Sequence, residues 1–342
     1  MSIILTLIII AVLVLVHEWG HYIVARKIGI PVHEFSLGFG YRLYSFKKDG
    51  VVFSIRAVPL GGFVRLAGEE VADMEAPGGY FNRKPVEKIA VSIAGPLMNF
   101  VIAIVIFILT LALIGSTEGS SEPVIGKVEA GFPAAQAGLQ QGDRIISIEG
   151  NEIKQWDDVV ENTRNSGKSV LNIQYDHRGE IYSVPVNTVV LDSAGSTGIG
   201  IYPIFIQHRY SLTQSVAMGF QQTYELTKAL VYSLVVIVTG GATMNDVAGP
   251  VGIVRMVGDF AQLGFVTLLT FTAFLSINLG FMNLLPIPAL DGGRIIFALF
   301  EMVTRKPFPR EKEGFLHWIG FMVLMLLMVL VTFNDIVRCF KG

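Results

Sequence analysis

A His-Glu-x-x-His motif inside the apolar N-terminal run of the chain constrains its fold more than any other feature. The motif comprises His17, Glu18 and His21, in a run that extends from Met1 to about Ala25. On a helix, positions i and i+4 lie on one face, so both imidazoles can reach a single zinc ion. Glu18 is then placed to take a proton from a water molecule, as in zinc peptidases. The alternative is a pair of buried histidines that hydrogen-bond to neighbouring helices.

The composition is that of a membrane protein. Of the 342 residues, 52% are hydrophobic and 16% are charged, with a mean hydropathy of +0.56. A net charge of −2 excludes the basic surface expected of nucleic-acid-binding proteins. The single cysteine, Cys339, excludes an internal disulfide and a cysteine-rich metal cluster. The N-terminal run lacks the basic start and the cleavage site of a signal peptide, so we expect it to remain as a membrane span.

Long apolar stretches predict a polytopic α-helical membrane protein with four transmembrane helices. The predicted spans are Ser2–Ala25, Ile89–Gly115, Gly264–Pro288 and Phe315–Phe333. A fifth apolar stretch, Ala229–Thr239, is too short to cross a bilayer and is expected in the interface or on the helix bundle. The expected domains are a first helical pair (1–115), an inserted domain (122–203), a linker with an amphipathic or interfacial helix (204–263) and a second helical pair (264–342).

Basic residues predict the orientation of the chain in the membrane. More than half of the 26 Lys and Arg residues lie in two connections, one between the first and second spans and one between the third and fourth. The positive-inside rule places both connections in the cytoplasm. The long connection from about Ser116 to Leu263 and both termini are therefore expected on the extracytoplasmic side.

That long connection contains a small domain, which we expect at Glu122–Pro203. Short runs rich in β-branched residues, such as SVLNIQY and EIYSVPV, are separated by Gly, Asn and Asp turn residues. The segment Gly131–Gly150 resembles the short helix and the following Gly-Asp-x-Ile strand of bacterial PDZ domains. The sequence therefore predicts an inserted α+β PDZ-like domain.

The connection between the first two spans contains a segment with strand periodicity, Val51–Leu66. Apolar and polar residues alternate from Phe53 to Ala57, and Pro59–Gly62 has the composition of a turn. We expect a membrane-associated β-hairpin, because strand backbone at membrane depth is tolerated only where protein buries it or where it lines a cavity. The alternative is an ordinary hairpin in the cytoplasm.

A catalytic zinc ion has three protein ligands and one open position, so a third ligand is needed. The candidate is Asp291, in the sequence Asn-Leu-Leu-Pro-Ile-Pro-Ala-Leu-Asp-Gly-Gly that begins at Asn283. The first and third spans both start outside, so His17, His21 and Asp291 are expected near the same cytoplasmic face. The two prolines interrupt helical hydrogen bonding, which in membrane proteins marks cavities and substrate sites. Asp291 could alternatively act only as a helix cap beside the two glycines.

Two asparagines in apolar surroundings, Asn99 and Asn283, are candidates for hydrogen bonds to an oxyanion or to a substrate backbone. They could equally hold helices together. Gly95 and Pro96 should allow close helix approach and bend the second span. Arg294 is expected as an interfacial anchor. The remaining histidines are expected on surfaces or in packing, and they are His33, His177, His208 and His317.

The order of these motifs resembles the site-2 protease family of intramembrane zinc metalloproteases, in particular the bacterial branch of the regulator of sigma-E protease. The resemblance covers essentially the whole chain. It implies Zn2+ bound by His17, His21 and Asp291. It also implies that Glu18 is the general base and that Asn283 supports catalysis. The implied substrate-binding residues are Asn99, then Val51, Phe53 and Ile55 of the hairpin, and Gly198, Ile199, Gly200 and Ile201 of the PDZ-like groove.

The leading hypothesis from this resemblance is a zinc endopeptidase of the bacterial inner membrane, with its active site toward the cytoplasm. It would cut transmembrane segments of single-pass proteins in regulated intramembrane proteolysis. By resemblance the substrates are anti-sigma factors already clipped outside, or remnant signal peptides. The alternative is a PDZ-bearing membrane adaptor with a vestigial metal site. A transporter with a broken third helix is disfavoured, because the chain shows no internal repeat. Some relatives carry two tandem PDZ domains, whereas this chain has length for one.

Overall fold

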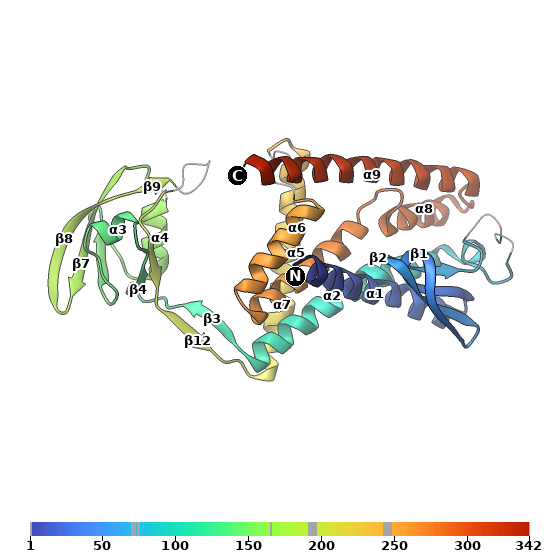
Figure 1. The fold of residues 1–342 in the computed structure, drawn as a ribbon, viewed down its shortest axis with the longest axis horizontal. Coiled ribbons are helices and arrows are strands. Elements are labelled where there is room, and N and C mark those ends of the chain that lie inside the picture. Colours follow the sequence, from blue (N-terminus) through green and yellow to red (C-terminus); the bar gives the residue numbers. More distant parts are fainter. Residues whose placement is uncertain are drawn as a thin grey trace. The chain divides into compact units, whose positions relative to one another are not determined.

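The chain divides into two units in the computed structural model, which describes residues 2–69, 73, 76–164, 166–190, 197–241 and 248–341. A helical unit combines the chain up to Leu113 with the chain from Ser211 onward. The second unit, Ile114–Tyr210, is inserted between these two parts (Figure 1). The insertion therefore interrupts the helical unit in sequence.

Long apolar helices form most of the helical unit. Its described helices are α1 (Ser2–Ile28), α2 (Pro85–Leu113), α5 (Leu212–Val238), α6 (Pro250–Gln262), α7 (Phe265–Asn283), α8 (Asp291–Thr304) and α9 (Arg310–Lys341), with a 3-10 turn, η2 (Tyr80–Asn82), before α2. By length and composition, α1, α2, α7 and residues Arg310–Arg338 of α9 are candidate membrane spans. Helix α2 packs against both α1 and α7.

A buried ion pair ties α8 to α2. Lys88 Nζ lies 2.8 Å from Glu301 Oε2, and the two side chains are 7% and 9% exposed. Glu301 Oε1 also accepts a hydrogen bond from the backbone N–H of Phe308. Such a pair is costly to break, because either partner alone would be an unpaired buried charge. The pair therefore fixes the place of α8, which begins at Asp291.

Residues 204–263, expected to be a linker with an amphipathic or interfacial helix, contain two helices of the helical unit, α5 and α6. Helix α5 begins with a capping box in which Ser211 and Gln214 exchange side-chain and backbone hydrogen bonds. Its residues Leu226 and Leu230 pack against a buried cluster around Phe107 of α2. The apolar stretch Ala229–Thr239 is thus the end of a longer helix. The polar residues in its first half hide the helix from a search for apolar runs.

Two bent strands, β1 (Val32–Lys48) and β2 (Val51–Leu66), form a sheet between α1 and α2 in the sequence. Asp49 and Gly50 connect them, and both have positive φ, as in the tight turns of β-hairpins. From this turn the two strands pair antiparallel. The turn therefore sets the register of a hairpin that spans both strands.

The start of β1 lies between the two halves of β2. Residues Glu34–Leu37 pair with Gly62–Arg65 and also with Val52–Ile55. The prediction of a hairpin within Val51–Leu66, with a turn at Pro59–Gly62, is therefore wrong, because the halves of β2 pair with β1 and not with each other. Alternation of polar and apolar residues predicts a strand but does not identify its partner.

A buried carboxylate joins the segments of this sheet. Glu34 is 3% exposed and accepts hydrogen bonds from Ser54 Oγ at 2.6 Å and from Arg56 at 2.8 Å. Arg42 lies 3.1 Å away. Burial would raise the pKa of Glu34, but the bonds from Ser54 and Arg56 and the charge of Arg42 hold it below its usual value. Glu34 is therefore charged at neutral pH and holds the bent strands together.

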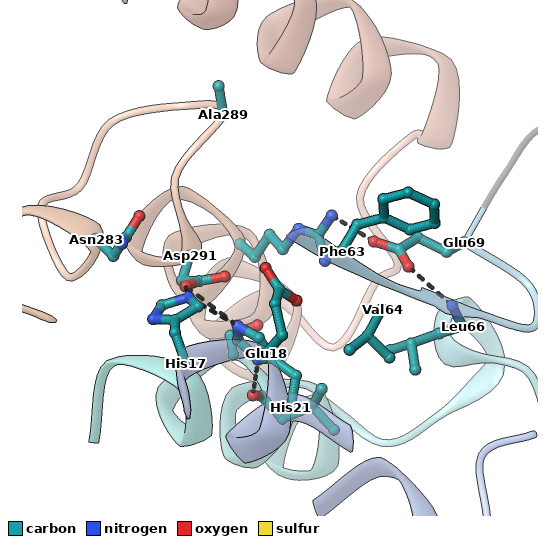
Figure 2. A pocket seen from close by; sticks show the side chains of 13 residues that line it. His17, Glu18, His21, Phe63, Val64, Leu66, Glu69, Asn283, Ala289 and Asp291 are labelled. Atoms are coloured by element: carbon teal, nitrogen blue, oxygen red, sulfur yellow. Dashed lines mark hydrogen bonds and ion pairs between the residues drawn. The ribbon is translucent and has the colours of Figure 1, made fainter. Parts of the chain in front are cut away.

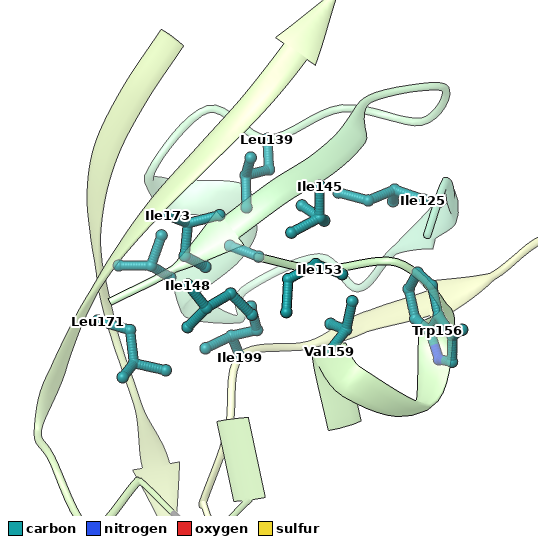
Figure 3. Close-up of a cluster of buried hydrophobic side chains, with 12 residues drawn as sticks. Ile125, Leu139, Ile145, Ile148, Ile153, Trp156, Val159, Leu171, Ile173 and Ile199 are labelled. Carbon is teal, nitrogen blue, oxygen red and sulfur yellow. The ribbon is translucent and has the colours of Figure 1, made fainter. Parts of the chain in front are cut away.

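The inserted unit is an α+β domain with its own core. Its elements are β3 (Ser116–Gly119), β4 (Ile125–Val128), α3 (Pro133–Gln136), β5 (Arg144–Ile148), β6 (Asn151–Glu152), α4 (Trp156–Arg164), β7 (Val170–His177), β8 (Glu180–Asn187), β9 (Val189–Val190), β10 (Thr197–Gly198), β11 (Ile201–Pro203) and β12 (Phe205–His208). The main sheet has the order β6-β5-β7-β8, and β4 pairs with β11, β9 with β10 and β3 with β12. Ile148, Leu171 and Ile173 meet Val159 of α4 in the core (Figure 3). The helix and strand predicted within Gly131–Gly150 are present as α3 and β5.

Candidate metal centre

Three potential metal ligands converge in the helical unit (Figure 2). His17 and His21 lie one turn apart on α1, and Asp291 is the first residue of α8. The two histidine Nε2 atoms are 3.1 Å apart. Asp291 Oδ2 lies 3.1 Å from Nε2 of His17 and 3.4 Å from Nε2 of His21. We call these three residues the ligand triad.

The ligand triad has the size of a zinc site. Zinc bonds of about 2.0–2.1 Å in tetrahedral geometry place the ligand atoms roughly 3.3 Å from one another. The three distances in the triad match this edge length within a few tenths of an ångström. Among the described residues the group contains three ligands, which leaves the fourth position for water or substrate, as catalytic zinc requires.

Both histidine rings are held by groups of α2. His21 Nδ1 lies 2.8 Å from the carbonyl oxygen of Val91, so Nδ1–H donates there and Nε2 is free to bind metal. The side-chain amide of Asn99 lies 3.1 Å from His17 Nδ1. A metal on His17 Nε2 requires a proton on Nδ1, and the Asn99 amide then turns its oxygen, which has no other described partner, to accept it. The two rings therefore present the same nitrogen to a metal.

A glycine on α2 makes room for the rings. A Cβ on Gly95 would overlap His21 Nε2 and would lie 2.7 Å from His17 Nε2. Gly20 of α1 similarly faces Ala94, where an added Cβ would lie 2.7 Å from the backbone carbon of Ala94. Close packing of small residues is how membrane helices bring their backbones together. Gly95 is thus needed for the ligand triad as well as for the helix contact.

Glu18 opens onto a cavity of about 250 Å³ beside the ligand triad (Figure 2). It comes directly after His17 on α1, and its Cγ lies 3.4 Å from the position of a Cβ on Gly62. A carboxylate at the edge of such a cavity can act on a water molecule in the open ligand position. The cavity is also lined by Phe63, Val64, Leu66, Glu69, Val91, Ser92, Asn283, Ala289 and Arg294.

The backbone between α7 and α8 bends sharply to present Asp291. Ala289 has a φ of 81°, a left-handed conformation that is rare for a residue other than glycine. A Cβ on Gly292 would overlap the carbonyl oxygens of Leu284 and Leu285. The glycine after Asp291 is therefore required because the loop folds directly over the first turn of α8.

Arg294 lines the cavity, so the expectation of an interfacial anchor is wrong. It forms an ion pair with Glu69, and its guanidinium carbon lies 5.9 Å from the centre of the Tyr80 ring. Glu69 Oε2 also accepts a hydrogen bond from the backbone N–H of Leu66 at 3.3 Å. The pair links α8 to the end of β2. No spacing in the sequence indicates a contact between residues so far apart.

The two asparagines predicted to hydrogen-bond to an oxyanion or a substrate differ in their access to the cavity. Asn283 lines the cavity, and its amide nitrogen donates to the carbonyl of Leu279 at 3.0 Å. Asn99 is fully buried behind His17, where a substrate cannot reach it. The expectation that Asn99 contacts substrate is therefore wrong, since its contact is with a ligand ring.

The hairpin residues expected to bind substrate do not line the cavity. Val51 is buried in the core beneath the sheet, Phe53 packs beside it, and Ile55 is 49% exposed. The residues of β2 that line the cavity are Phe63, Val64 and Leu66. The structure therefore places the second half of β2, and not the three predicted residues, beside the ligand triad.

The segment Gly198–Ile201 lies in the inserted unit. It lines a groove of about 270 Å³ together with Phe132 and residues of α4. Ile199 is 2% exposed and belongs to the core of the unit. All four residues of the segment line this groove.

Comparison with known proteins decides the family. Residues 5–327 match peptidase family M50. The chain belongs to this family. It is 33% identical to the regulator of sigma-W protease RasP of Bacillus subtilis, over 421 aligned positions that cover 99% of each chain. It is 34% identical to the zinc metalloprotease RasP of Geobacillus kaustophilus, over 419 positions that cover 99% of this chain and 98% of the relative.

This M50 protein is thus a zinc metalloprotease of the site-2 protease type, and its cofactor is Zn2+. The family predicted from the motifs is confirmed. The RasP alignments contain more positions than this chain has residues, so those relatives carry segments without a counterpart here. A protein of Clostridium perfringens is 38% identical over 339 positions, which cover 98% of this chain and 99% of the relative.

A PDZ domain of known structure also resembles part of the M50 chain. The PDZ domain of an SdrC-like protein from Listeria monocytogenes is 26% identical, with a TM-score of 0.21, and covers 25% of this chain and 88% of that domain.

We predict that Gly95→Ala abolishes zinc binding by the M50 protein. The added methyl would occupy the space of the two histidine rings and push α2 from α1. Zinc per protein, measured by elemental analysis of the detergent-purified chain, should fall at least tenfold. Gly314→Ala is the matched control, because a Cβ there meets no atom within 4 Å. Full zinc content in Gly95→Ala would show that the rings do not lie against α2.

Proposed function

We propose that the protein cleaves transmembrane segments of single-pass membrane proteins, with zinc held by His17, His21 and Asp291 and with Glu18 as general base. The observation that carries this proposal is the ligand triad, which matches the edges of a zinc tetrahedron and faces one cavity together with Glu18. A candidate membrane span, α1, supplies three of these four groups. An adaptor with a vestigial metal site would have no need to keep this arrangement.

The chain's own groups can carry the proton movements of peptide hydrolysis. Zinc bound by the triad would supply Lewis-acid activation of water and of the scissile carbonyl. Glu18 takes a proton from the attacking water and delivers it to the leaving amide nitrogen, so its carboxylate is restored after each turnover. Asn283 lines the same cavity, and the second N–H of its amide would donate a hydrogen bond to the developing oxyanion.

We infer that the substrate binds as an added strand along the end of β2. Phe63–Leu66 reaches the cavity, and among the described residues this segment pairs with β1 on one side only. An unpaired strand edge is a template for an extended peptide. A helical substrate would keep its peptide groups hydrogen-bonded internally, so a transmembrane segment must unwind before it is cut. Strand addition would stabilise the unwound form beside Glu18.

The proposed setting is the bacterial inner membrane, with four spans, both termini and the PDZ-like unit outside and the ligand triad toward the cytoplasm. The four candidate spans support the number of crossings. The basic residues in the connection between the first two spans and in the connection between the last two spans support the orientation. This arrangement keeps the ligand triad and the PDZ-like unit at opposite faces of the membrane.

The proposed substrates are anti-sigma factors already clipped outside, or remnant signal peptides. The name of the Bacillus subtilis relative, regulator of sigma-W protease, supports the first class. Outside the membrane, the PDZ-like unit would control which substrates reach the catalytic cavity. We favour a filter that excludes bulky outer domains over capture of a new carboxylate by the backbone of Gly198–Ile201.

We predict that Glu18→Gln retains zinc but loses cleavage. The ligands remain while the proton acceptor is removed, and loss of a general base costs two to four orders of magnitude in rate, roughly. The measurements are zinc content and cleavage of a reconstituted transmembrane substrate. Asp291→Ala should instead lose zinc as well as activity. Near-normal turnover by Glu18→Gln would remove Glu18 from the proposed chemistry.

The proposed strand edge predicts a difference between the two halves of β2. Phe63→Ala should lower kcat/KM and change which residues are tolerated next to the cut, because Phe63 lines the cavity. Ile55→Ala is the matched control, since Ile55 lies in the other half of β2 and is 49% exposed. Cleavage of a substrate library by both variants is the measurement. An equal effect of the two changes would reject binding along Phe63–Leu66.

Deletion of the PDZ-like unit separates the two proposed roles. If the unit is a filter, deleting Glu122–Pro203 should allow cleavage of substrates with bulky outer domains and leave short substrates unchanged. If it captures a carboxylate, short clipped substrates should lose cleavage. The measurement compares one transmembrane segment that carries either a large folded or a minimal outer domain. Unchanged rates for both substrates would reject both roles.

A further inference from the structure

Helix α9 touches the loop that carries Asp291 at two points. The backbone N–H of Ala289 donates a hydrogen bond to Nδ1 of His317 at 2.7 Å. Three residues later, a Cβ on Gly320 would overlap the carbonyl oxygen of Pro288. The backbone of α9 therefore lies directly against this loop. The sequence predicts His317 on a surface or in packing and does not indicate this contact.

The hydrogen bond to His317 is made by Ala289, a loop residue with an uncommon backbone conformation. Ala289 has a φ of 81°, and a left-handed conformation in a residue with a Cβ persists only where its surroundings hold it. Ala289 lies two residues before Asp291 and lines the catalytic cavity. Within the same loop, the backbone N–H of Leu290 donates a hydrogen bond to the carbonyl oxygen of Ile287. A change of φ at Ala289 would move the residues that follow it, including the proposed ligand Asp291.

The surroundings of His317 suit an acceptor role for its Nδ1. The ring packs edge-on against Phe297 of α8, with centroids 5.5 Å apart. Its Nε2 is buried without a hydrogen-bond partner among the described residues, and Glu313 Oε1 lies 3.9 Å away. When Nδ1 accepts from a backbone N–H, the ring proton of neutral histidine is on Nε2. The loop contact thus selects one tautomer of His317.

We propose that His317 is a positioning residue of the metal centre. By accepting the N–H of Ala289, it holds the left-handed conformation of the loop and so directs Asp291 toward the two histidines. His317 does not touch the metal or the substrate in this role. The proposal rests on the proposed ligand set, since it concerns the placement of Asp291.

Two substitutions separate the acceptor from the packing of the ring. His317→Phe keeps an aromatic ring against Phe297 but has no acceptor, whereas His317→Gln loses the ring and keeps an acceptor oxygen. We expect His317→Phe to weaken zinc binding about 10- to 100-fold, as is typical for loss of a supporting contact. We expect a smaller loss for His317→Gln. Trp318→Ala is the control for disturbance of α9, because Trp318 is 59% exposed.

A second substitution in the loop tests the mechanism. Glycine adopts positive φ without strain, so Ala289→Gly removes the need for an outside group to hold the loop. In the His317→Phe background, Ala289→Gly should restore zinc affinity by roughly tenfold. Affinity is measured by competition with a chromophoric chelator on the full chain in detergent, a readout that does not depend on cleavage. Unfolding temperature is recorded for each variant to show that the chains compared are folded.

The outcomes distinguish this proposal from the ligand set on which it rests. Asp291→Ala is measured in parallel, and full zinc affinity there would reject the ligand set itself. If Asp291→Ala loses zinc but His317→Phe binds as the parent does, only the role of His317 is overturned. Failure of Ala289→Gly to restore binding, or a loss in Trp318→Ala as large as in His317→Phe, would also overturn it.

Discussion

The contact of α1 with α2 is the constraint on which the rest of the site depends. Where Gly20 faces Ala94 and Gly95 faces the two histidines, the helix backbones approach more closely than side chains would permit. That approach brings the carbonyl of Val91 to His21 and the amide of Asn99 to His17. The rings therefore point their Nε2 atoms the same way, and contacts that hold the ligand pair in this orientation reduce the cost of ordering the site on metal binding.

The third ligand needs a different solution, because a continuous helix could not present it. Asp291 follows a loop with two prolines and begins a new helix, which the ion pair of Lys88 with Glu301 holds on α2. Non-helical backbone in a membrane protein needs protein partners for its polar groups. In this chain the partners include the first turn of α8 and the side chain of His317. The loop, the first turn of α8 and His317 of α9 thus together hold the carboxylate of Asp291 in place.

How much the sequence predicts depends on whether partners are local. His17 and His21 are four residues apart, and helical periodicity alone places them together. Asp291 is far from them in the sequence, but successive spans alternate in direction, and this alternation predicts that Asp291 lies at the same membrane face. The assignment of these residues to zinc stays a prediction, whereas the family and its cofactor are confirmed by the relatives.

The features that the sequence analysis does not predict all depend on which segments become partners. Val51–Leu66 forms a strand, as its periodicity predicts, but both of its halves pair with β1, the strand before it across the Asp49-Gly50 turn. Arg294 meets Glu69, and His317 meets Ala289. Neither of these two side-chain contacts has a characteristic spacing, because each is set by how helices and strands pack rather than by periodicity.

X-ray absorption at the zinc edge of the purified, zinc-loaded protein tests the central claim most directly. The account predicts two imidazole ligands and oxygen ligands at about 2.0–2.2 Å. It also predicts that the spectrum of any zinc retained by Asp291→Ala differs from that of the parent. A site with three or more imidazoles, or with sulfur, or a spectrum that Asp291→Ala leaves unchanged, would contradict a metal centre built from α1 and the start of α8.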